Sequence, residues 1–121
     1  MAVTNLTLTA LATYLFKDTG STNSAAVVKA SSGTLYAIYV DNSLNAAASY
    51  LKLYDSAGAI VVGTTAPDFI FRIPGLFVGN ILIATSGIAF ASGLQSATVT
   101  AGGTAGTTAP SAAVTIDVVY T

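Results

Sequence analysis

The chain has 121 residues, of which four are Lys or Arg and five are acidic, so its net charge is −1. This length is typical of one domain, and so few basic residues leave no patch that could neutralise nucleic-acid phosphates or hold an anionic membrane. Apolar residues make up 53% of the chain and charged residues 7%, which excludes a disordered chain. The surface must then be built from small neutral residues, and such a surface favours association with other proteins.

The elements predicted along the chain are short β-strands separated by glycines. Glu is absent and Lys is rare, whereas β-branched and aromatic residues fill the apolar runs, which favours strands over helices. In chain order, we expect strands over residues 6–16, 25–30, 34–41, 49–55, 59–62, 69–73, 80–84, 88–91, 94–100 and 113–120. Residues 42–49 include three alanines without β preference and predict a helical turn, and the small residues of 100–112 predict a long loop.

Frequent turn signals between short strands are typical of an all-β sandwich or barrel. About eight main strands with long loops predict an all-β, jelly-roll-like antiparallel β-sandwich, with an immunoglobulin-like sandwich as the second choice. We expect one domain over residues 1–121, in which residues 1–24 form an extended N-terminal arm or a strand. No secretory signal is expected at the N-terminus, and the most apolar window, 76–91, is too short and too interrupted to span a membrane.

Two neighbouring strands, 34–41 and 49–55, are largely apolar on both alternating sets of side chains, whereas a half-solvated strand has one polar set. The set assigned to the core is Ile38, Val40, Leu51 and Leu53. The opposite set then directs Tyr39, Tyr50 and Tyr54 outward. Tyrosine is enriched at protein interfaces because it combines an apolar ring with a polar tip, so these three residues are the candidate interface. The alternative is that their rings only cover the rim of the sheet.

Scarce charge, together with strands that are apolar on both faces, predicts a homo-oligomer, with a trimer as the first choice and a dimer as the second.

A resemblance to a known family also indicates a protein that works in an assembly. The stretches VDN (40–42) followed by NAAASYLKLYD (45–55), and AGGTAGTTAPS (101–111), resemble a family of small tailed-phage virion proteins, over a region from about Val28 to the C-terminus. The resemblance implies a jelly-roll decoration or cement protein that binds the major capsid protein on the outside of a phage head. It implies no catalytic, cofactor-binding or metal-binding residue, so a structural, non-enzymatic role is expected.

An aspartic protease of the retroviral type is the first alternative function. Residues 18–21 read Asp-Thr-Gly-Ser, a motif of enzymes that place two Asp carboxylates about 3 Å apart. Lys17 stands where that family has an apolar residue, and Asn80 stands where an Arg usually follows the Gly of the second motif. We therefore expect residues 17–20 to form a turn around Asp18 and Gly20, in which these residue types are common.

A carbohydrate-binding or fibre module is the second alternative, because an exposed tyrosine ring can stack on a sugar. Other chemistry is restricted, since the chain contains no Cys, no His and no Glu. Oxygen ligands for a hard cation could come from Asp41, Asn42, Asn45 and Asp55. Their spacing fits no EF-hand, so neither a metal nor a cofactor is predicted.

Overall fold

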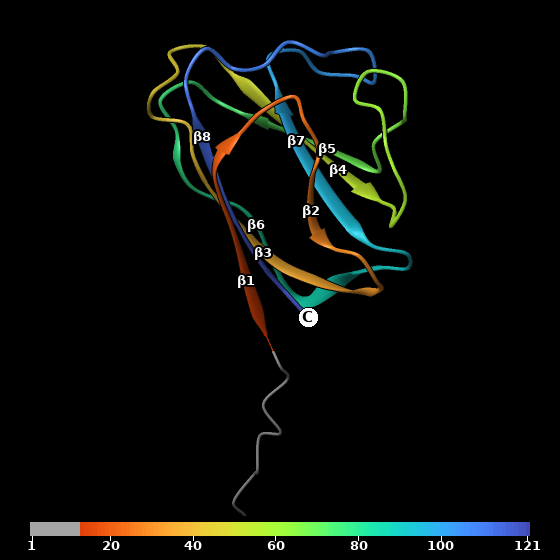
Figure 1. Cartoon of the computed structure of the whole chain (residues 1–121). Coiled ribbons are helices and arrows are strands. Elements are labelled where there is room, and N and C mark those ends of the chain that lie inside the picture. The colour runs from red at the N-terminus through yellow and green to blue at the C-terminus, as the bar shows by residue number, and fades with distance from the viewer. Residues whose placement is uncertain (1–12) are drawn as a thin grey trace, which may run out of the picture.

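The computed structural model describes residues 13–121, which form eight β-strands and no helix (Figure 1). The strands are β1 (Tyr14–Ser21), β2 (Ala26–Lys29), β3 (Gly33–Asp41), β4 (Ser49–Asp55), β5 (Phe69–Ile73), β6 (Val78–Phe90), β7 (Leu94–Val99) and β8 (Val114–Tyr120). They build two four-stranded antiparallel sheets that pack as a sandwich. The all-β prediction is therefore confirmed.

The order of the strands is that of a jelly roll. One sheet runs β1-β8-β3-β6 and the other β2-β7-β4-β5. Strands pair from the two ends of the described chain inward, β1 with β8, β2 with β7, β3 with β6 and β4 with β5, and every pair is antiparallel. A long hairpin rolled up in this way places successive pairs in opposite sheets, which is the eight-stranded jelly-roll arrangement. The first-choice fold is confirmed.

The core lies between the two sheets and is built from one alternating set of side chains in each strand. Ile38 and Val40 of β3 and Leu51 of β4 are 0% exposed, and Leu53 is 1% exposed, as predicted. The other buried members of the core are Val28, Leu35, Ile73, Phe90, Leu94, Val114, Ile116 and Val118. Burial of an apolar side chain stabilises a fold by about 1.5–3 kcal/mol, so this cluster is the main favourable term in folding.

Four of the predicted elements differ from the structure. Residues 59–62 form no strand, because the chain turns there and the backbone N–H groups of Thr64 and Thr65 both donate to the carbonyl of Val61. Residues 42–49 contain turns and bends but no helix. The strands expected at 80–84 and 88–91 are one strand, β6, which continues through Gly87 at a φ of +74°. A Cβ at Gly87 would collide with Thr34 Cγ2, so the glycine marks a bend within a strand and not its end.

The turn predicted at residues 17–20 is also wrong. Residues 17–20 lie within β1 and not in a turn, although the register with β8 shifts between Asp18 and Ser21. In this bulge, Asp18 Oδ1 accepts a hydrogen bond of 3.0 Å from the backbone N–H of Gly20. Residues 6–12 of the predicted strand 6–16, and residues 1–12 of the expected arm, lie outside the described residues.

Candidate functional site

The sheet β2-β7-β4-β5 has an outer face that its own chain covers. The outward residues of β4 are Tyr50, Lys52 and Tyr54, and their partners on β7 are Val99, Ala97 and Gln95. Although these residues face away from the core, five of the six are buried and Tyr50 is half-buried. The cover consists of the segments 56–68 and 100–113, which lie on this side of the sandwich in Figure 1.

Lys52 fastens the segment 100–113 onto this face. Its Nζ donates hydrogen bonds to the carbonyl oxygens of Thr104 at 3.0 Å and Gly106 at 2.7 Å. The side chain is 0% exposed, and burial lowers the pKa of its ammonium group below the usual 10.5. Within the segment, the N–H of Thr100 donates to the carbonyl of Thr108 at 2.9 Å. The small-residue loop therefore has a defined position over β4.

Gln95 holds the segment 56–68 in the same way. Its Nε2 donates to the carbonyl oxygens of Ser56 at 2.9 Å and Gly58 at 2.6 Å. The two covering segments also touch each other, because a Cβ at Gly63 would collide with Thr107. The apolar second face of β4 is thus internal packing between a sheet and its own loops.

The structure separates the three predicted interface tyrosines. Tyr54 lies on the outer face as predicted but is 1% exposed, so the prediction that it is an accessible interface residue is wrong. The physical reason is that β4 is a central strand whose outer face is closed by loops from distant parts of the chain. Tyr50 is half-buried next to Gly102. Tyr39 is 38% exposed and belongs to the other sheet. The interface role of Tyr39 and Tyr50 stays a prediction.

The outer face of the sheet β1-β8-β3-β6 carries an apolar row that crosses all four strands. Strand pairing places Leu15 opposite Val119, Val119 opposite Ala37 and Ala37 opposite Ile83. Leu15 and Ile83, at the two ends of the row, are 64% and 69% exposed, whereas Val119 and Ala37 are half-buried. We use the name open face for this apolar row together with the adjacent polar row, which contains Lys17, Asp117, Tyr39 and Asn80.

The second row of the open face is polar. It places Lys17 opposite Asp117, Asp117 opposite Tyr39 and Tyr39 opposite Asn80. Asp117 Oδ1 is buried and accepts no hydrogen bond from residues 13–121. A buried carboxylate oxygen is costly to leave without a donor, so the open face carries both exposed apolar surface and an unsatisfied acceptor.

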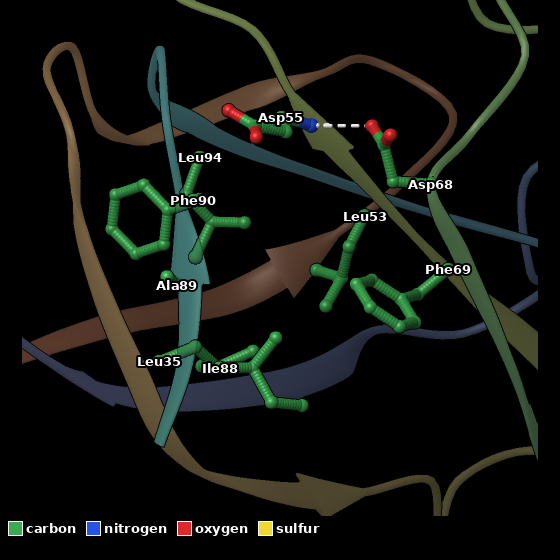
Figure 2. A pocket seen from close by; sticks show the side chains of 9 residues that line it. All are labelled: Leu35, Leu53, Asp55, Asp68, Phe69, Ile88, Ala89, Phe90 and Leu94. Atoms are coloured by element: carbon green, nitrogen blue, oxygen red, sulfur yellow. Dashed lines mark hydrogen bonds between the residues drawn. The ribbon is translucent and has the colours of Figure 1, made fainter. Parts of the chain in front are cut away.

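A cavity of about 250 Å³ opens at the flank of the sandwich between the edge strands β5 and β6 (Figure 2). Two carboxylates, Asp55 and Asp68, line it on one side, and the other lining residues are Leu35, Leu53, Phe69, Ile88, Ala89, Phe90 and Leu94. Asp68 Oδ2 accepts a hydrogen bond of 2.6 Å from the backbone N–H of Asp55. No Lys or Arg lines the cavity.

The carboxylate of Asp55 binds the connection between β6 and β7. It accepts hydrogen bonds from the backbone N–H groups of Ala91 at 2.9 Å, Ser92 at 2.8 Å and Gly93 at 3.3 Å. The bonds from Ala91 and Ser92 are the main reason that the pKa of Asp55 lies below its usual 3.8. This carboxylate is therefore ionised at neutral pH, and its acceptors are already engaged by the turn.

The candidate cation ligands do not come together. Asn42 and Asn45 are buried in a network that joins the loop after β3 to residues 111 and 112, in which Asn45 Oδ1 accepts from the N–H of Ala112 at 2.9 Å. Asp55 lies at the flank cavity instead. Among residues 13–121, no group of three or more acidic side chains could hold a metal ion, and no helix could span a membrane.

The open face and the flank cavity could not be found from local sequence patterns. The apolar row joins positions 15, 37, 83 and 119, and only the pairing of four strands brings them side by side. The chain matches no protein-family model, no curated protein and no solved structure. Residues 13–121 thus form a jelly-roll sandwich in which loops cover the central strands of one sheet, whereas the other sheet carries the open face.

Proposed function

We propose that this protein is a structural virion protein, a decoration or cement protein that binds the outside of a phage head as a homo-oligomer and stabilises the lattice. The observation that carries the proposal is the contrast between the two sheets. The chain covers the central strands β4 and β7 of one outer face with its own loops and leaves Val27 and Ile70 exposed at the edges of that sheet. On the other face, the apolar row is exposed at Leu15 and Ile83 and half-buried between them. Exposed apolar surface is a feature of interaction sites.

The open face suits contacts between copies of a nearly uncharged chain. Lys17 and Asp117 stand next to each other in its polar row, and Asp117 Oδ1 lacks a donor among the described residues. The donors of Lys17, Tyr39 and Asn80 are exposed, so a second copy could reach them, whereas the buried Asp117 Oδ1 stays covered. The apolar row would provide the non-directional part of the contact, and the polar row would fix its orientation.

Binding to a lattice would add the effect of multivalency. A stable protein interface buries about 1,600 Å² in total, and about 1,000 Å² is the lower limit for a specific one. An oligomer that engages several lattice positions gains avidity without new chemistry, because each further contact forms within the same complex. Weak contacts with the major capsid protein are then sufficient for stable attachment. The low sequence charge and the resemblance to small phage virion proteins support the same role.

Particles test the proposal directly. Intact phage particles that encode this chain should carry it at a fixed copy number per head after gradient purification. Removing it should leave assembled heads that break at lower temperature or at lower chelator concentration than complete heads. The proposal is wrong if purified particles lack the chain, or if heads with and without it have the same thermal stability.

A further inference from the structure

The flank cavity has the composition of a binding site for one side chain. Its apolar lining includes buried core residues, among them Leu35 at 2% exposure and Leu53 at 1%, whereas Phe69 and Ala89 are exposed lining residues. A cavity of about 150 Å³ lined by aliphatic and aromatic side chains is large enough for benzene. At about 250 Å³, this cavity has room for one aromatic or branched aliphatic side chain.

The charge at the rim restricts what can enter. Asp55 and Asp68 line the same end of the cavity, where Figure 2 shows them together above the apolar side chains. The Asp55 carboxylate is engaged by three backbone N–H groups, whereas Asp68 Oδ2 accepts the N–H of Asp55 and Asp68 Oδ1 remains open to a further donor. Since no Lys or Arg lines the cavity, a positive charge beside the apolar group complements the rim.

The position of the cavity favours an extended polypeptide as the occupant. β5 and β6 are the last strands of their sheets on this flank, so each has one edge without a partner strand among the described residues. An unpaired edge binds an extended segment through backbone hydrogen bonds, while a neighbouring pocket takes one of its side chains. Ile88 of β6 and Phe69 of β5 both line the cavity, so the edge strand of each sheet contributes to it.

We propose that the flank cavity binds an extended segment of a partner protein, which inserts one large apolar side chain and places a Lys or Arg next to it against Asp68. That the occupant is a polypeptide rests on the proposed role in assembly, in which the partner is the lattice protein. The open face would then join copies of this chain, and the flank cavity would join the chain to its lattice. The two contacts use different surfaces and can be lost separately.

The test uses the isolated full-length protein and three acetylated hexapeptides of equal length. They contain Phe-Lys, Phe-Glu or Ala-Lys at the centre, and binding is followed by the amide resonances of Leu35, Ile88 and Ala89. We expect the Phe-Lys peptide to shift these resonances and to bind at least about tenfold more tightly than the other two. Equal binding of the Phe-Lys and Phe-Glu peptides, or no shift with any peptide, would overturn the proposal and make the cavity a packing gap.

A charge variant tests the role of Asp68. Asp68→Asn keeps an oxygen that can accept the N–H of Asp55 but removes the charge, so the preference for Lys over Glu should disappear. Asp41→Asn is the matched control, because it removes one carboxylate at the C-terminal end of β3, which is not part of the cavity lining. It should leave the preference for Lys over Glu intact.

If 2-phenylethylammonium binds as tightly as the Phe-Lys peptide, the cavity is a small-molecule site and the proposed polypeptide occupant is wrong. Because these assays need no particles, they can fail while the proposed function stands, and the reverse also holds.

Discussion

Tyr54 is of a residue type that is enriched at protein interfaces, and yet it belongs to the interior. Its ring is 1% exposed, and its hydroxyl is buried without a hydrogen-bond partner among the described residues. We expect Tyr54→Phe to leave the free energy of unfolding unchanged or to raise it by up to about 1 kcal/mol, because an unsatisfied polar group is removed. Tyr54→Ala should lower it by about 3–5 kcal/mol through loss of a large buried side chain.

Urea unfolding of both variants checks this prediction. Leu53→Ala, on the opposite face of the same strand, is the reference for a core truncation and should cost about 2–5 kcal/mol. A loss of less than about 1 kcal/mol for Tyr54→Ala would mean that the loops do not cover β4 as described.

Lys52, which holds the covering loop, should make the free energy of unfolding depend on pH. Burial lowers the pKa of the folded-state ammonium group below 10.5, so the unfolded chain binds more protons than the folded chain at pH values between the two pKa values. Stability should therefore rise as the pH increases toward 10.5. A neutral amine still has two N–H groups for the carbonyls of Thr104 and Gly106. Denaturant unfolding from about pH 7 to about pH 10 should show this rise in the wild type and a smaller one in Lys52→Met. Equal slopes for the two proteins would exclude Lys52 as the cause.

At the scale of elements, Asp55 ties the connection between β6 and β7 to the end of β4. The pKa of this carboxyl is lowered in the folded state, so its stabilising contribution is complete above pH 3.8 and is lost as the pH falls further. We expect Asp55→Asn to lower the thermal midpoint at about pH 6, and we expect this difference to shrink at about pH 2.5, where Asp55 is increasingly protonated in both states. Thermal melts at the two pH values check it. A difference of the same size at both would show that the charge of Asp55 does not matter.

The elements also show what the sequence could and could not predict. The bounds predicted for β4 and β5 agree with the structure, because each is an uninterrupted run of β-forming residues between turn signals. The run at 59–62 looks like a strand locally, but it belongs to a loop that Gln95 holds against the sheet. The break predicted between the strands 80–84 and 88–91 is wrong, because local patterns do not distinguish a glycine bend such as that at Gly87 from a turn.

The candidate site was predictable only in part for a related reason. The sequence indicated that both faces of 49–55 are apolar, and it could not show what covers the second face. The cover depends on hydrogen bonds from Lys52 to carbonyls 52 and 54 residues further along the chain. Tyr39 and Tyr54 both lie on outer faces as predicted, yet Tyr39 is 38% exposed and Tyr54 1% exposed. Each follows a buried aliphatic residue, so the local pattern does not distinguish them.

At the scale of the whole molecule, the open face is the surface that we propose joins copies of the chain. Ile83 is 69% exposed at one end of its apolar row, and Val61 is 61% exposed in a loop on the covered side of the sandwich. Both are β-branched, so an aspartate at either position introduces the same charge at a similar exposure. Only Ile83→Asp should weaken association, because a charge must be desolvated to enter an apolar contact.

The most direct measurement is the mass in solution by light scattering at micromolar concentration, for the wild type, Ile83→Asp and Val61→Asp. We expect a wild-type mass of two or three chains, the same mass for Val61→Asp, and the mass of a single chain for Ile83→Asp. Thermal melts of the three proteins serve as the control for folding. A wild type that is a monomer throughout the concentration range, or an Ile83→Asp variant that associates as the wild type does, would contradict the account.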